Sequence, residues 1–80
     1  MERKILLAEL NSIFSDVFDN ENLKISETTT SADVEGWDSL AHITLIAEIE
    51  EAFKMKFMMK DVIGMKNVGE MLDIIERETA

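Results

Sequence analysis

The sequence predicts an all-α fold, a four-helix bundle of three longer helices and one short helix, with a long loop between the first two. Three observations support this fold. The chain of 80 residues contains no Pro and only three Gly, which favours helices over a turn-rich β fold. Apolar side chains recur at helical spacing in three separate segments. The hydrophobic content of 46% suffices for a small core, and we expect residues 1–80 to form one domain.

The first helix is predicted over Glu2–Phe18. Its polar side chains lie opposite an apolar stripe, which is typical of a helix with one face in the core. The stripe consists of Leu6, Leu10, Ile13, Phe14 and Val17. No residue of this helix suggests chemistry, so we assign it to the core.

The segment Asp19–Trp37 is too long to be a bare connector in so small a chain, because such loops are usually packed or functional. Leu23, Ile25 and Val34 are its expected anchors on the bundle. The polar run Thr28–Ser31 predicts local bonds between side chains and backbone. A calcium loop starting at residue 19 is excluded, because it would lack the glycine of the sharp turn.

The second helix is predicted over Ser39–Phe53, with Asp38 as its N-cap. Ser39 is then the first helical residue, with its hydroxyl pointing outward at the positive end of the helix dipole. An anionic group would be favoured there. The stripe expected to face the bundle contains His42, Leu45, Ile46, Ile49 and Phe53.

Trp37 and His42 flank the start of this helix, and each allows two interpretations. Trp37 either packs the loop against the bundle, with its indole N–H at the surface, or contacts partner proteins. His42 either packs as a hydrogen-bonded side chain or lines the entrance to a cavity. A catalytic pairing of His42 with Ser39 is excluded, because the Ser39 hydroxyl is expected to point away from the bundle.

A short third helix is predicted over Met59–Ile63, with Gly64 as a cap of positive φ. Methionines are frequent here, and they either line an adaptable pocket or fill a loosely specified core. Asn67 opens the last helix, and Glu70 is the expected second member of a capping box. The apolar stripe of this helix is Val68, Met71, Leu72, Ile74 and Ile75.

The charge balance limits the classes of partner. A net charge of −9 argues against nucleic acid and anionic membranes, and favours proteins with basic patches. The chain has no Cys and no secretory apolar segment, so we expect a cytoplasmic protein, and a monomer. Neither a nucleophile–base pair nor a metal cluster can be assigned, so no catalytic or metal-ligating residue is predicted.

The stretch Asp38-Ser39-Leu40 at a helix start, preceded by Gly36-Trp37 in a small acidic helical chain, resembles the acyl carrier protein family. The resemblance covers nearly the whole chain. It implies that Ser39 covalently carries 4′-phosphopantetheine donated by coenzyme A, within the Asp38–Leu40 motif. It also implies that Asp38 assists the phosphopantetheinyl transferase, through Mg²⁺. The protein would then present an acyl group as a thioester, without being an enzyme itself.

The resemblance also implies that the second helix docks enzymes that load, condense or transfer acyl groups. The expected docking face consists of Leu40, Ala41, Thr44, Ala47, Glu48 and Glu51. Primary fatty-acid carriers often have acids where this chain has Ala41 and Thr44, which indicates a stand-alone carrier of a specialised pathway, in fatty-acid, polyketide or related biosynthesis. The alternative from another class is a small acidic interaction domain that is never modified.

Overall fold

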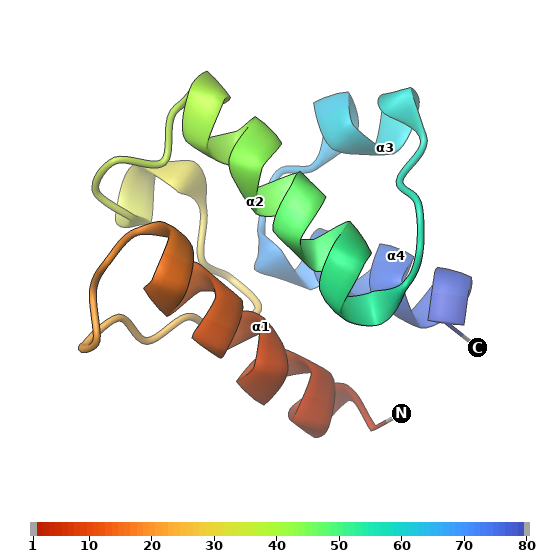
Figure 1. Cartoon of the computed structure of the whole chain (residues 1–80), viewed down its shortest axis with the longest axis horizontal. Helices are drawn as coiled ribbons and strands as arrows, with labels where there is room; N and C mark the ends of the chain where they lie inside the picture. The colour runs from red at the N-terminus through yellow and green to blue at the C-terminus, as the bar shows by residue number, and fades with distance from the viewer. Residues whose placement is uncertain (1, 80) are drawn as a thin grey trace.

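The computed structural model describes residues 2–79, which form four α-helices and one 3₁₀ turn. These elements are α1 (Arg3–Val17), η1 (Ser31–Asp33), α2 (Ser39–Phe53), α3 (Met59–Gly64) and α4 (Val68–Thr79). The predicted all-α fold with three longer helices and one short helix is confirmed. In Figure 1, α2 lies between α1 and α3, and the long segment after α1 lies at the end of the bundle where α2 begins. No helix within residues 2–79 has the length and apolar content to cross a membrane.

One predicted helix end is wrong. Gly64 is the last residue of α3 and not a left-handed cap, because the chain leaves α3 in an extended direction through Met65 (φ −68°, ψ 122°). The left-handed cap occurs instead at the end of α2, where Lys54 has φ 53° and donates its N–H to the carbonyl of Glu50. The C-terminal cap of α3 therefore depends on the backbone conformation of the residue that follows Gly64, which the glycine alone does not predict.

The core lies between α1, α2 and α4. Its fully buried side chains are Leu6, Leu10, Phe14, Leu45, Ile49, Val68, Met71, Leu72 and Ile75. In contrast, α3 contributes no buried residue, and only its flanking residues Met55, Phe57 and Met65 pack against the core. The short helix is therefore held mostly by contacts at its ends.

The long segment between α1 and α2 is anchored as predicted. Ile25 and Val34 are buried, and Leu23 packs against the core. The Asn11 side chain of α1 donates to the carbonyl of Leu23 (3.0 Å) and accepts the N–H of Ile25 (2.7 Å). This segment is thus a packed part of the fold.

The same segment also caps the start of α4. The N–H groups of Val68 and Gly69 donate to the carbonyl oxygens of Thr29 (2.9 Å) and Glu27 (2.8 Å). Two otherwise unpaired donors of the helix are therefore satisfied from outside it. A Cβ at Gly69 would lie 2.9 Å from the Glu27 carbonyl oxygen, so this close approach requires glycine.

The predicted capping box at α4 forms only in part. Asn67 Oδ1 accepts the N–H of Glu70 at 2.9 Å, as expected. The Glu70 carboxylate, however, accepts the N–H of Lys66 at 3.2 Å, one residue before the expected donor. A complete capping box occurs at η1, where Thr30 and Asp33 bond reciprocally.

Arg3 joins the two ends of the chain to the long segment. Its guanidinium group pairs with Glu27 (2.9 Å), Asp73 (2.7 Å) and Glu76, and donates to the carbonyl of Gly69 (3.0 Å). The hydrogen bonds that Arg3 donates to the carboxylates, that to Glu27 first, raise the pKa of Arg3, and the same bond lowers the pKa of Glu27.

Candidate functional site

Ser39 is the first residue of α2, and its side chain is exposed. Asp38 is the N-cap, in an extended conformation, and its carboxylate accepts the N–H of Ala41 at 2.8 Å. Its carbonyl oxygen accepts the N–H of His42 at 2.9 Å, which starts the helix. The cap predicted from the sequence is confirmed.

Gly36 makes the turn that leads into α2. Its φ of 89° lies in the region that side chains other than glycine rarely adopt. A Cβ there would lie 3.8 Å from Phe18, an ordinary contact, so the backbone angle and not the space favours glycine. The turn is closed by hydrogen bonds from Trp37 N–H to the Val34 carbonyl (3.2 Å) and from Asp38 N–H to the Gly36 carbonyl (2.9 Å).

Trp37 packs against α1, as one of its two interpretations predicts. Its ring meets Phe14 edge-on, with the ring centroids 5.1 Å apart at 84°, and lies 6.3 Å from the centroid of Phe18. The expectation that its indole N–H lies at the surface is wrong. That N–H donates to Nδ1 of His42 at 3.0 Å, and the centroids of the two rings lie 5.9 Å apart.

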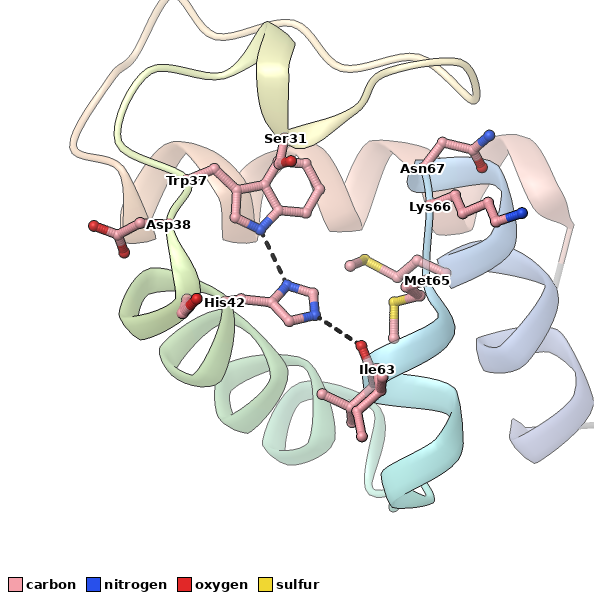
Figure 2. A pocket seen from close by; sticks show the side chains of 11 residues that line it. Ser31, Trp37, Asp38, His42, Ile63, Met65, Lys66 and Asn67 are labelled. Atoms are coloured by element: carbon pink, nitrogen blue, oxygen red, sulfur yellow. Dashed lines mark hydrogen bonds between the residues drawn. The ribbon is translucent and has the colours of Figure 1, made fainter.

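His42 is half-buried and hydrogen-bonded on both sides of its ring, so its packing interpretation is confirmed. Nε2 lies 3.3 Å from the carbonyl oxygen of Val62 in α3. Figure 2 shows the imidazole between the indole of Trp37 and the last turn of α3. His42 also lines a hollow, so its second interpretation, at the entrance to a cavity, stays a prediction.

This hollow, of about 320 Å³, lies beside Ser39 between α2, α3 and the start of α4. Its lining residues are Ser31, Trp37, Asp38, Ser39, His42, Val62, Ile63, Met65, Lys66, Asn67 and Met71. In Figure 2 the Asp38 carboxylate points away from the hollow, while Met65 faces it. Of the methionines between α2 and α4, Met65 lines the hollow, Met55 is buried in the core, and Met58 and Met59 are exposed. Met71 of α4 is a fully buried core residue that also borders the hollow.

The start of α2 fits a phosphodiester on Ser39. The hydroxyl is exposed, the first turn contains no acidic residue, and the positive end of the helix dipole favours an anion. Asp38 is the nearest acid, and its carboxylate is already bonded to the Ala41 N–H. Within residues 2–79, no cluster of three or more His, Asp or Glu side chains is arranged to hold a metal ion.

The outer face of α2 is largely exposed. Leu40 is 75% exposed, and Thr44, Ala47, Glu48 and Glu51 are exposed, whereas Ala41 is half-buried. Ile43, which was not among the residues predicted for this face, is 64% exposed. The helical spacing of Leu40, Ile43 and Ala47 was the signal that could have placed it on this face.

Two further apolar side chains that the sequence analysis missed are exposed on α3. Met59 and Ile63, one helical turn apart, are 74% and 77% exposed. In so short a helix the apolar pattern does not distinguish a buried face from an exposed one.

Comparisons with known proteins identify the family. The family model described as phosphopantetheine attachment site matches residues 8–75. The chain is also similar to the solution NMR structure of a holo acyl carrier protein from Geobacter metallireducens, at 35% identity. That match covers 90% of this chain and 83% of the other, with a TM-score of 0.85. A search of curated proteins found no match. The chain therefore belongs to the phosphopantetheine attachment site family as a carrier domain of the acyl carrier protein type, which uses covalently attached 4′-phosphopantetheine and is not itself an enzyme.

Proposed function

We propose that Ser39 carries the phosphopantetheine arm, and that the protein presents an acyl or related group to the enzymes of a specialised biosynthetic pathway. The observation that carries this proposal is the exposed hydroxyl of Ser39 at the capped start of α2, next to the hollow of about 320 Å³. The other two residues of the Asp38–Leu40 motif take distinct roles. Asp38 fixes the first helical turn, and Leu40 is exposed beside Ser39.

The chain's own residues prepare the site for the arm. When bound, the arm supplies a thiol that holds the cargo as a thioester. Asp38 keeps the first turn of α2 in place through the N–H of Ala41, so Ser39 is presented in a defined direction. The helix dipole favours the phosphate at that point. The apolar side chains of Met65 and Met71 in the hollow would shield an apolar part of the arm or cargo from water.

The proposed docking face is the exposed side of α2, used by the transferase and by biosynthetic enzymes with basic patches. It consists of Leu40, Ala41, Thr44, Ala47, Glu48 and Glu51. Its apolar end lies next to Ser39 and its acidic end lies further along the helix. Acidic side chains at the rim mainly raise the association rate and select partners. Ile43 extends the apolar end, where a partner would make its closest contact to the arm.

The proposed specialised pathway rests on Ala41 and Thr44. At these positions the docking face offers a partly buried methyl group and a hydroxyl that donates to the Leu40 carbonyl at 3.3 Å, and no acid. Steering by Glu48 and Glu51 is retained, but the acids that primary fatty-acid carriers often have at the positions of Ala41 and Thr44 are absent. A monomer working in the cytoplasm remains the expected state.

A count of thiols tests this function directly. The chain has no Cys, so any thiol that appears after incubation with coenzyme A and a phosphopantetheinyl transferase belongs to the arm. We expect one thiol per chain in the purified product, reactive with a maleimide, and none without the transferase. Loading with an acyl group should block this thiol, and hydroxylamine should restore it. A product without any thiol would contradict the carrier function.

A further inference from the structure

Trp37 and His42, the single Trp and the single His of the chain, connect three segments around the site. Trp37 precedes α2, His42 lies in its first turns, and the carbonyl of Val62 lies in α3. The Trp37 Nε1–H donates to His42 Nδ1 (3.0 Å), and His42 Nε2 lies 3.3 Å from the Val62 oxygen (Figure 2). The imidazole therefore bridges the segment before α2 to α3.

Only one form of His42 makes both hydrogen bonds. An indole N–H can only donate, so Nδ1 must accept with its lone pair. A carbonyl oxygen can only accept, so Nε2 must carry the proton. The neutral ring with its proton on Nε2 meets both conditions. The protonated ring places a second N–H against the indole N–H, so protonation breaks the bond to Trp37.

The bond to Val62 matters because α3 has few other contacts. This helix of six residues buries no side chain, and its last four carbonyl groups have no partner within the helix. His42 supplies such a partner from α2. Val62 and the following Ile63 line the hollow together with Ser39, so the position of this turn affects the width of the hollow.

We propose that His42 is a positioning residue for the arm. Its neutral ring, held by the hydrogen bond from Trp37, fixes the last turn of α3 against α2. Protonation of the ring breaks the bond to Trp37 and widens the hollow beside Ser39. The structural part of the proposal concerns the unmodified protein, and only its effect on the arm rests on the proposed function.

The charged and aromatic groups around the ring come from the start of α2, the rim of the hollow, α3 and the end of α1. Asp38 is the N-cap four residues before His42, and Lys66 lines the hollow. On α3, Asp61 pairs with Arg77 of α4 at 2.7 Å. Phe14 of α1 and Phe18, the residue that follows α1, pack their aromatic rings near Trp37. Histidine is the side-chain type whose ordinary pKa lies between about pH 5 and 8, so a variant without the imidazole separates its transition from those of the neighbouring groups.

The first experiment follows the unmodified protein by NMR from about pH 8 to pH 5. The His42→Gln variant is the matched control, because a side-chain amide can accept from Trp37 and donate to Val62 without titrating. We expect Nε2–H as the neutral tautomer of the wild type, and one transition shared by the indole N–H and the Ile63 signals. His42→Gln should keep its helical circular dichroism and show no transition. The proposal would be overturned by any of three results: an indole N–H signal of the wild type that does not change with pH, a neutral His42 with its proton on Nδ1, or an equal transition in His42→Gln.

The second experiment uses the protein carrying the arm. Signals of the pantetheine group should change with the same pH transition in the wild type and stay constant in His42→Gln. The His42→Leu variant, which loses both bonds and cannot titrate, should likewise show no pH transition of the pantetheine signals. An indole transition without any response of the arm would overturn the positioning role while the carrier function stands. If no arm attaches to Ser39, both the proposed function and the effect of His42 on the arm are wrong. The titration of the unmodified protein still tests whether protonation of His42 breaks its hydrogen bond to Trp37.

Discussion

The N–H of Gly69 donates to the carbonyl oxygen of Glu27 at 2.8 Å, which fixes the long segment after α1 to the start of α4. We predict that Gly69→Ala lowers the free energy of unfolding by about 1–3 kcal/mol, because its Cβ would lie 2.9 Å from that oxygen. Urea unfolding followed by circular dichroism measures this change.

Gly64→Ala is the matched control for this prediction. No atom lies within 4 Å of a Cβ built at Gly64, and its φ is not positive. Alanine should therefore leave stability unchanged or raise it by about 0.4–1 kcal/mol. Equal effects of the two substitutions would show that the contact between residues 27 and 69 is not tight.

Asp38 is predicted to have two separable roles. Asp38→Ala should lose about 1 kcal/mol of stability, because the N–H of Ala41 loses its cap. Asp38→Asn should keep most of that stability, since asparagine caps as well as aspartate. The asparagine variant should nevertheless accept the arm more slowly from the transferase, because it cannot bind Mg²⁺ as a carboxylate does. If the transferase modifies Asp38→Asn and the wild type at equal rates, the prediction that the Asp38 carboxylate assists the transferase is wrong.

Acid should weaken the contact between Arg3 and Glu27. The bond from Arg3 lowers the pKa of Glu27 in the folded protein. Its stabilising effect is therefore present above the ordinary pKa of a glutamate, about 4.3, and is lost as the pH falls through the lowered value. We expect Glu27→Gln to melt at a lower temperature than the wild type at neutral pH, and the difference to shrink on acidification. A difference that is constant with pH would contradict this linkage.

Partner choice is predicted to depend on Ala41 and Thr44. The Ala41→Asp, Thr44→Glu double variant should gain activity with generic fatty-acid synthase enzymes, mainly through faster association that high salt removes. The loaded wild type should be a poor substrate for the same enzymes. If the wild type already serves them as well as their own carrier does, the specialised-pathway proposal is wrong.

The structural features at the start of α2 could be predicted from the sequence because their signals are local. The cap at Asp38 and the inward stripe of α2 each depend on residues within a few positions of one another, and the structure confirms both. The hydrogen bond between Trp37 and His42, five residues apart, was not predicted, because the packing expected of each residue does not specify which partner its polar atoms meet.

Features that depend on distant residues were not predictable in this way. The bond from His42 to Val62 spans 20 residues, and the pairs of Arg3 with Glu27 and Asp73 span 24 and 70. The exposure of Ile63 depends on how α3 lies against the bundle, which a six-residue pattern does not specify.

The most direct test of the central proposal is the intact mass of the protein after incubation with coenzyme A and a phosphopantetheinyl transferase. The wild type should gain one phosphopantetheinyl group. The Ser39→Ala variant should gain none. The control Ser31→Ala, which removes another exposed hydroxyl of the same hollow, should be modified like the wild type. An unmodified wild type, or a modified Ser39→Ala variant, would contradict the assignment of Ser39 as the site of the arm.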